Sequence, residues 1–228
     1  MDLKSVLASL EAAGTAQNRK VYRRHGVGDP LYGVSYAMQG KLAKQNRNNT
    51  ELAIGLWETG NHDARILAAM IADPREIRSS RLDAWVGDLE NYVLTDAFSD
   101  LVGQSPFART KMRKWIRSGK EFVGAAGWSV LARLARQDSE LTDEELEGYL
   151  ETIEDEIHFR KNRARHSMNS ALLSLGVRNP KLERKAQAAA KRIGKVEVDH
   201  GETSCKTPDA TAYVKKTVAR RRATKQSG

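Results

Sequence analysis

A tyrosine and an aspartate four residues apart are the side chains of this sequence best suited to chemistry. Tyr92 and Asp96 lie in the run Asn-Tyr-Val-Leu-Thr-Asp at residues 91–96. On a helix this spacing places the phenol and the carboxylate on one face, one turn apart. An aromatic face attracts cations, and a carboxylate stabilises positive charge. The alternative interpretation is a helix cap, with Asp96 or Thr95 beginning the next helix at Ala97.

Apolar residues at helical spacing predict the elements that position this pair. Alternation with period two, which is typical of strands, is absent, so the sequence predicts an all-α fold. Pairs of helices joined by short breaks favour an α-solenoid over a compact bundle. The predicted helices include residues 3–13, 97–102, 120–136, 157–175 and 180–193, and Thr142 is predicted to cap another.

Composition narrows the class of protein. The 228 residues include a single cysteine, Cys205, and 38 lysines and arginines against 29 acidic residues, for a net charge of +9. One cysteine excludes an internal disulfide and is typical of a reducing compartment. No apolar run approaches the roughly 20 residues that span a bilayer, and no signal pattern begins the chain. We expect a cytoplasmic protein, in the cytosol or nucleoid of a bacterial cell, that is monomeric and binds a polyanion rather than a membrane.

Basic residues gather on particular predicted helices, whereas residues 138–156 are strongly acidic. Such segregation predicts a solenoid with one basic concave face, which attracts a phosphate backbone regardless of base sequence. The alternative is that the charged faces balance one another between paired helices. The predicted DNA-binding residues are Arg109, Lys111, Arg113, Lys114, Arg117, Lys120, Arg163, Arg165 and His166.

The all-helical plan, the basic helices and the run at residues 91–96 resemble the DNA alkylation repair family, the AlkD-like DNA glycosylases built from HEAT-like repeats. The resemblance covers roughly residues 32–191, and it is strongest at Leu56-Trp57-Glu58, at 92–96 and at 159–176. It implies a protein that holds double-stranded alkylated DNA on its basic concave face. It further implies hydrolysis of the N-glycosidic bond of positively charged N3- or N7-alkylpurines, without base extrusion and without a metal or other cofactor.

The family's tryptophan and aspartate, separated by three residues, fall on Tyr92 and Asp96, which the resemblance makes the catalytic pair. Departure of a cationic base leaves an oxocarbenium-like sugar, which a carboxylate can stabilise while it orients water. Tyrosine keeps the aromatic face of the tryptophan and adds a hydroxyl. The chemistry therefore accounts for both residue types.

Two other family positions differ in this chain. The second tryptophan of the family falls on Ser170, and its arginine falls close to Ala125. In the family these two residues are part of the cradle of side chains around the lesion. The nearby groups that could replace them here are Trp128, Arg165, His166 and Asn169. A lone histidine is also typical of a surface or capping group. A chain without the cradle is alternatively a non-catalytic binder of duplex or branched DNA. A helical protein-interaction scaffold is a third hypothesis.

The sequence predicts a helical repeat domain at residues 1–193 and a C-terminal segment at 194–228. Asp199, His200, Glu202 and Cys205 lie within seven positions, but one histidine and one cysteine make a poor zinc site. We expect instead a turn held by side-chain hydrogen bonds. The basic tail that follows is predicted to contact phosphates through Lys215, Lys216, Arg220, Arg221, Arg222 and Lys225.

Overall fold

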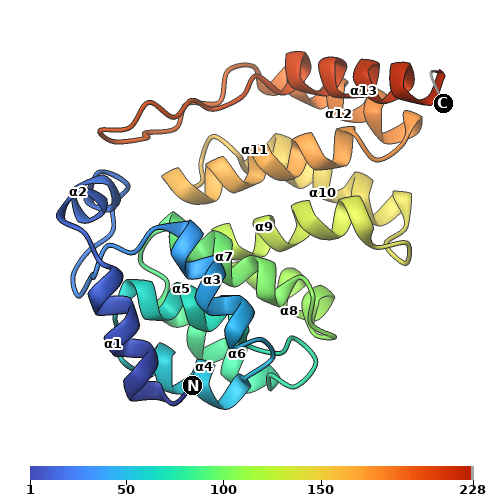
Figure 1. The fold of residues 1–228 in the computed structure, drawn as a ribbon. Helices are drawn as coiled ribbons and strands as arrows, with labels where there is room; N and C mark the ends of the chain where they lie inside the picture. Colours follow the sequence, from blue (N-terminus) through green and yellow to red (C-terminus); the bar gives the residue numbers. More distant parts are fainter. Residues whose placement is uncertain (227–228) are drawn as a thin grey trace. The chain divides into compact units, whose positions relative to one another are not determined.

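The computed structural model describes residues 1–226 and contains no strand in that part of the chain (Figure 1). A short 3-10 helix at Val86–Asp88 accompanies the α-helices. The α-helices are α1 (Leu3–Ala13), α2 (Ala16–Arg24), α3 (Tyr36–Gln45), α4 (Thr50–Glu58), α5 (His62–Ile71), α6 (Ser79–Trp85), α7 (Tyr92–Val102), α8 (Ala108–Trp115), α9 (Glu121–Gln137), α10 (Asp143–Glu156), α11 (Asn162–Gly176), α12 (Pro180–Ile193) and α13 (Ala210–Gln226).

Side-chain caps set the start of most of these helices. Thr142 accepts a hydrogen bond from the backbone N–H of Glu145 at 3.2 Å, which confirms the predicted cap of α10. Helices α1 and α12 have the predicted bounds. The helix predicted at residues 157–175 is wrong at its start, because residues 157–161 form a turn before α11.

The backbone contacts divide the chain into two units. Unit 1 contains residues 1–108 and 200–204, and unit 2 contains residues 109–199 and the segment from Cys205 onward. The domain boundary predicted after residue 193 stays a prediction, since both sides of it belong to unit 2; α12 ends there, and Gly194 has a positive φ of 69°. Beyond it the chain is irregular up to α13. The predicted contacts of the Arg221, Arg222 and Lys225 side chains lie outside the described part of the structure.

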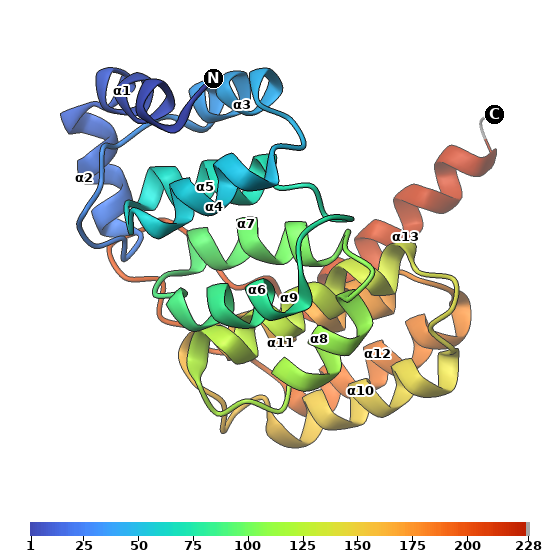
Figure 2. The same ribbon diagram turned by 90° about the horizontal axis from the view of Figure 1, so that it is seen from below.

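The core of unit 1 contains an aromatic stack that joins three helices. The rings of Trp57 on α4 and Trp85 on α6 are parallel, with centroids 4.2 Å apart, and Phe98 on α7 lies 5.9 Å from Trp57. All three side chains are almost completely buried. Helix α5 contacts α3, α4 and α7, so unit 1 is a stack of helix layers in which α7 is supported from two sides (Figure 2).

The core of unit 2 depends on close contact between α9 and α11. A small residue on α9 also allows a close approach to the end of α8, at residues 115–116. A Cβ atom on Gly127 would lie 2.5 Å from the amide nitrogen of Ile116. Helix α12 packs on both α10 and α11, and α13 covers α11 through Val214, which is buried against Gly176.

Among the described residues, no helix has both the length and the apolar character that a bilayer span requires.

Candidate functional site

Helix α7 presents Tyr92 and Asp96 one turn apart. Its cap is Asn91, whose side chain accepts a hydrogen bond from the N–H of Leu94 at 2.9 Å. The alternative in which Thr95 or Asp96 begins a helix is therefore wrong, as is the predicted helix start at residue 97. The Thr95 hydroxyl instead donates to the carbonyl of Asn91 from inside the helix. The same-face spacing of the phenol and the carboxylate is present, and Asp96 is exposed.

The hydroxyl of Tyr92 is held by a residue far away in the sequence. A hydrogen bond joins it to Nδ1 of His25, the residue that ends α2, and the two rings meet edge to face with centroids 5.8 Å apart. Two contacts therefore orient the half-buried Tyr92 ring. Sequence reasoning missed His25, because its position at the end of a basic segment carries no signal of a partner on α7.

Two further phenols belong to this cluster. Tyr36 is 48% exposed, yet burial of its hydroxyl end raises its pKa to about 12, and the nearby Tyr22, Asp96 and Tyr92 act in the same direction. Burial likewise raises the pKa of Tyr22 to about 12, and its hydroxyl donates to the carbonyl of Val34 at 2.6 Å. Both phenols therefore remain neutral hydrogen-bond donors at physiological pH.

Buried polar groups support the cluster of Tyr22, Tyr36 and Tyr92. The Asp63 carboxylate accepts hydrogen bonds at 2.7–2.9 Å from the backbone N–H groups of Tyr32, Gly33 and Val34. His62 is 2% exposed, its ring lies 5.6 Å from that of Tyr22, and Asn91 lies beside it with Nδ2 3.5 Å from its Nδ1. These contacts fix the loop between α2 and α3 against α5, and the hydrogen bond from Tyr22 to Val34 ties α2, which precedes His25, to the same loop.

Two arginines of α8 form ion pairs with acidic residues of the protein. Arg109 forms ion pairs with Asp138, at 2.9 Å, and with Glu140, while Arg113 pairs with Glu145. Lys111 is only 3% exposed. Helix α12 repeats the pattern, with its basic residues Lys181, Lys185 and Arg192 paired to Glu147 and Glu154 of α10.

The interpretation in which charged faces balance one another between helices is thus correct for α8, α10 and α12. The predicted DNA contacts of Arg109, Lys111 and Arg113 are not supported, because acidic partners or burial engage these side chains. Lys114 is exposed and has its own interactions. Arg117 and Lys120, at the turn between α8 and α9, are exposed and have no ion-pair partner in the part of the chain that the structure describes.

Of the three DNA contacts predicted on α11, that of Arg165 involves a side chain that the fold already uses. The Arg165 guanidinium donates to the carbonyls of Glu197, His158 and Arg160 at 2.7–3.2 Å, so it braces the chain before and after α11. Arg163 and His166 are partly exposed, and each has interactions of its own.

The substitutes proposed for the missing cradle groups do not form a cradle. Trp128 is completely buried, so its ring cannot contact a ligand in this structure. Asn169 is 1% exposed and donates to the carbonyl of Pro208 at 3.1 Å, and the Ser170 hydroxyl donates to the carbonyl of His166 in its own helix. Ala125, close to which the resemblance places the family arginine, is a buried residue of α9. These side chains are used by the fold, and the positions expected for a second tryptophan and an arginine hold no equivalent group.

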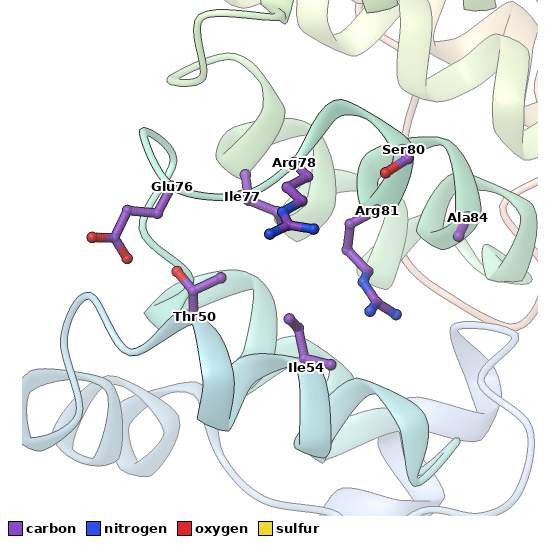
Figure 3. Close-up of a pocket in the computed structure, with 8 residues that line it drawn as sticks. All are labelled: Thr50, Ile54, Glu76, Ile77, Arg78, Ser80, Arg81 and Ala84. Atoms are coloured by element: carbon purple, nitrogen blue, oxygen red, sulfur yellow. The ribbon is translucent and has the colours of Figure 1, made fainter.

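Other potential sites are poorly supported. In the described residues no three histidine, cysteine or acidic side chains are grouped so that they could hold a metal ion. The Asp199 segment is a turn tied to Asn162 by two hydrogen bonds of 2.8 Å, as its composition predicts. Figure 3 shows a pocket of about 350 Å³ in unit 1, where Arg78 and Arg81 lie opposite Ile54, but none of the predicted site residues lines it.

Comparison with known proteins decides the family. A family model described as "DNA alkylation repair enzyme" matches residues 6–222. The chain belongs to this family. It is 31% identical to an uncharacterised protein of Listeria innocua, Lin0241, and 30% identical to one of Listeria monocytogenes, Lmo0209; each match covers 91% of this chain and 93% of the relative.

One solved structure resembles the chain over nearly its whole length. It represents "a new family of proteins related to the HEAT-like repeat DNA glycosylases with affinity for branched DNA structures". The two chains are 33% identical, the TM-score is 0.88, and the match covers 97% of this chain and 96% of that one. The predicted all-α, HEAT-like fold and the predicted family are therefore confirmed.

Proposed function

We propose that this protein binds branched duplex DNA and acts without excising a base. The observation that carries the proposal is the likeness, over 97% of the chain, to a protein with affinity for branched DNA. The resemblance agrees with a non-catalytic role, because it places Ser170 at the family's second tryptophan and Ala125 close to the family's arginine. Trp128, the tryptophan expected to replace the missing ring, is buried, so among the described residues the aromatic groups near Asp96 are tyrosines.

The cations available for phosphate contact are those that the fold does not neutralise. In unit 1, Lys20 and Arg24 are exposed on one face of α2 and line a pocket together with Glu202, but neither forms an ion pair in the described part of the chain. Like charges four residues apart destabilise a helix slightly, so an external anion is their natural partner. In unit 2 the corresponding cations are Arg117, Lys120 and Lys161. A phosphate backbone supplies the complementary charge.

The test compares branched and linear DNA of equal length and arm sequence. Binding to three-way and four-way junctions and to the linear duplex is measured at physiological salt by gel shift and by fluorescence anisotropy. We expect the junctions to bind at least about tenfold more tightly, a difference of roughly 1.4 kcal/mol. Equal affinities would overturn the preference for branches. An absence of binding to any DNA would favour the protein-interaction scaffold instead.

Excision of alkylated purines is the second candidate function, and the exposed Asp96 one turn from Tyr92 favours it. The measurement is release of N3- and N7-methylpurine from methylated duplex DNA by the wild type and by the Asp96→Asn variant. If the protein is a glycosylase, we expect the wild type to release base and Asp96→Asn to lose about 100-fold or more, because the carboxylate acts only in the transition state. No release by the wild type excludes this candidate, and equal release by both proteins excludes the role of Asp96.

A further inference from the structure

One apolar side chain of unit 2 projects into solvent in an unusual way. Phe159, in the turn between α10 and α11, is 88% exposed, the most of any large apolar side chain that the structure describes. A single exposed apolar residue is common on flexible loops. This one differs, because the backbone that carries it is held on both sides.

Hydrogen bonds hold the residues on both sides of Phe159. The imidazole of His158 donates to the carbonyl of Ile193 at 2.9 Å, and the Arg165 guanidinium donates to the carbonyls of His158 and Arg160. The Arg160 side chain donates in turn to the carbonyls of Ser118 and Ile116 at 3.1 and 3.4 Å. The turn is therefore preorganised while its aromatic ring remains outside the core.

Exposed cations lie on the turn of Phe159 and on the neighbouring turn. The hydrogen bonds of Arg160 place the turn at residues 116–120 directly against the turn of Phe159. Arg117 and Lys120 on the first turn and Lys161 on the second are exposed, with no ion-pair partner in the described part of the chain. An exposed ring between cations is the combination with which proteins bind a base and its flanking phosphates.

We infer that Phe159 stacks on an unpaired or unstacked base at the branch point of DNA, while Lys161, Arg117 and Lys120 contact the adjoining phosphates. This inference rests on the proposed binding of branched DNA. A continuous duplex buries its base faces in the stack, whereas a branch point exposes them. The Phe159 ring therefore adds affinity only for branched DNA, whereas the cations add affinity for any DNA.

The experiment measures how Phe159→Ala and Phe159→Trp change the affinity for a three-way junction and for its linear control. We expect Phe159→Ala to weaken junction binding about tenfold or more, the effect of losing one base–aromatic stack, and to change linear binding less than about twofold. Phe159→Trp retains the junction affinity. A fluorescent adenine analogue, 2-aminopurine, placed at the branch point should change its emission with the wild type and with Phe159→Trp but not with Phe159→Ala.

Tyr213→Ala is the matched control, because Tyr213 is another exposed aromatic residue of unit 2, on α13. It should leave both affinities within about twofold of the wild type. Junction binding that survives Phe159→Ala, or an equal loss on linear DNA, overturns the stacking role. An equal loss with Tyr213→Ala, or a Phe159→Ala variant whose oligomeric state differs in gel filtration, overturns it as well. If the wild type itself does not prefer the junction, the proposed function fails, and that result is distinct from a failure of Phe159 alone.

Discussion

The side chains around Tyr92 illustrate how burial changes the chemistry of individual groups. His62 lies beneath the cluster, and burial lowers its pKa to about 4, an effect to which Arg65 adds and which Asp63 opposes. The imidazole is therefore neutral in the folded protein under physiological conditions. Tyr22, Asn91 and Asp63 surround it, so protonation would place a cation in a site built for a neutral ring.

His62 gives a prediction about stability and pH. Because the unfolded chain binds a proton on this residue near its ordinary pKa of 6.5 and the folded chain only near 4, the stabilisation is complete above about pH 6.5 and is lost as the pH falls towards 4. Between pH 7.5 and pH 4.5 the loss from this residue is roughly 2 to 3 kcal/mol. Urea unfolding of the wild type and of His62→Gln across this range measures it. The variant should show a flatter profile, and parallel profiles would contradict the assignment.

At the scale of elements, charge complementarity and close packing hold the helices of unit 2 together. The basic faces of α8 and α12 meet the acidic residues of α10 and its preceding loop, yet exposed ion pairs of this kind each stabilise a protein only slightly. The apolar contact of α9 with α11 and with the end of α8 is the larger contribution. Small side chains on α9 make that contact possible.

Gly127 and Gly148 form a matched pair for testing this packing. Gly127→Ala would place a methyl group against the backbone of residues 115–116, so we expect a loss of about 1–3 kcal/mol in the free energy of unfolding. Gly148, in α10, has no atom within 4 Å of the corresponding position. Gly148→Ala should therefore stabilise the protein by about 0.5–1 kcal/mol through helix propensity. Thermal and urea denaturation of the two variants would show opposite shifts, and a neutral Gly127→Ala would refute the close approach.

For the molecule as a whole, the net charge of +9 overstates the number of cations available to bind a polyanion. Many arginines and lysines of α8 and α12 already have acidic partners within the protein, and the unneutralised cations are fewer and local. Each phosphate contact releases a condensed counterion, so the salt dependence of binding counts these contacts.

The salt dependence separates paired from unpaired cations. We expect Lys120→Gln to reduce the slope of log affinity against log salt concentration by about 1, because it removes one phosphate contact. Arg192→Gln removes the same charge from the protein, but Arg192 is paired with Glu154, so the slope should stay unchanged. Equal changes in both variants would mean that net charge, rather than the position of the charge, determines binding.

Much of the fold follows from interactions within a few residues of sequence. Helical periodicity predicts an all-α chain, and Thr142 and Gly14 mark helix ends correctly because caps are local hydrogen bonds. The same-face placement of Tyr92 and Asp96 is likewise a consequence of four-residue spacing. The start of α7 was missed because Asn91 and Thr95 are both capping residue types, and only the backbone shows that Asn91 is the cap.

Only the tertiary structure shows which residues contact the side chains of the candidate site and of the basic helices. His25 reaches Tyr92 across 67 positions, Glu145 neutralises Arg113 across 32, and Trp128 turns into the core. The sequence shows which helices are basic, but packing determines which cations have acidic neighbours. It also determines which aromatic rings remain exposed, as the contrast between Trp128 and Phe159 illustrates. The sequence by itself therefore determined the helices and the family, whereas the functional surface depended on long-range contacts that local spacing does not encode.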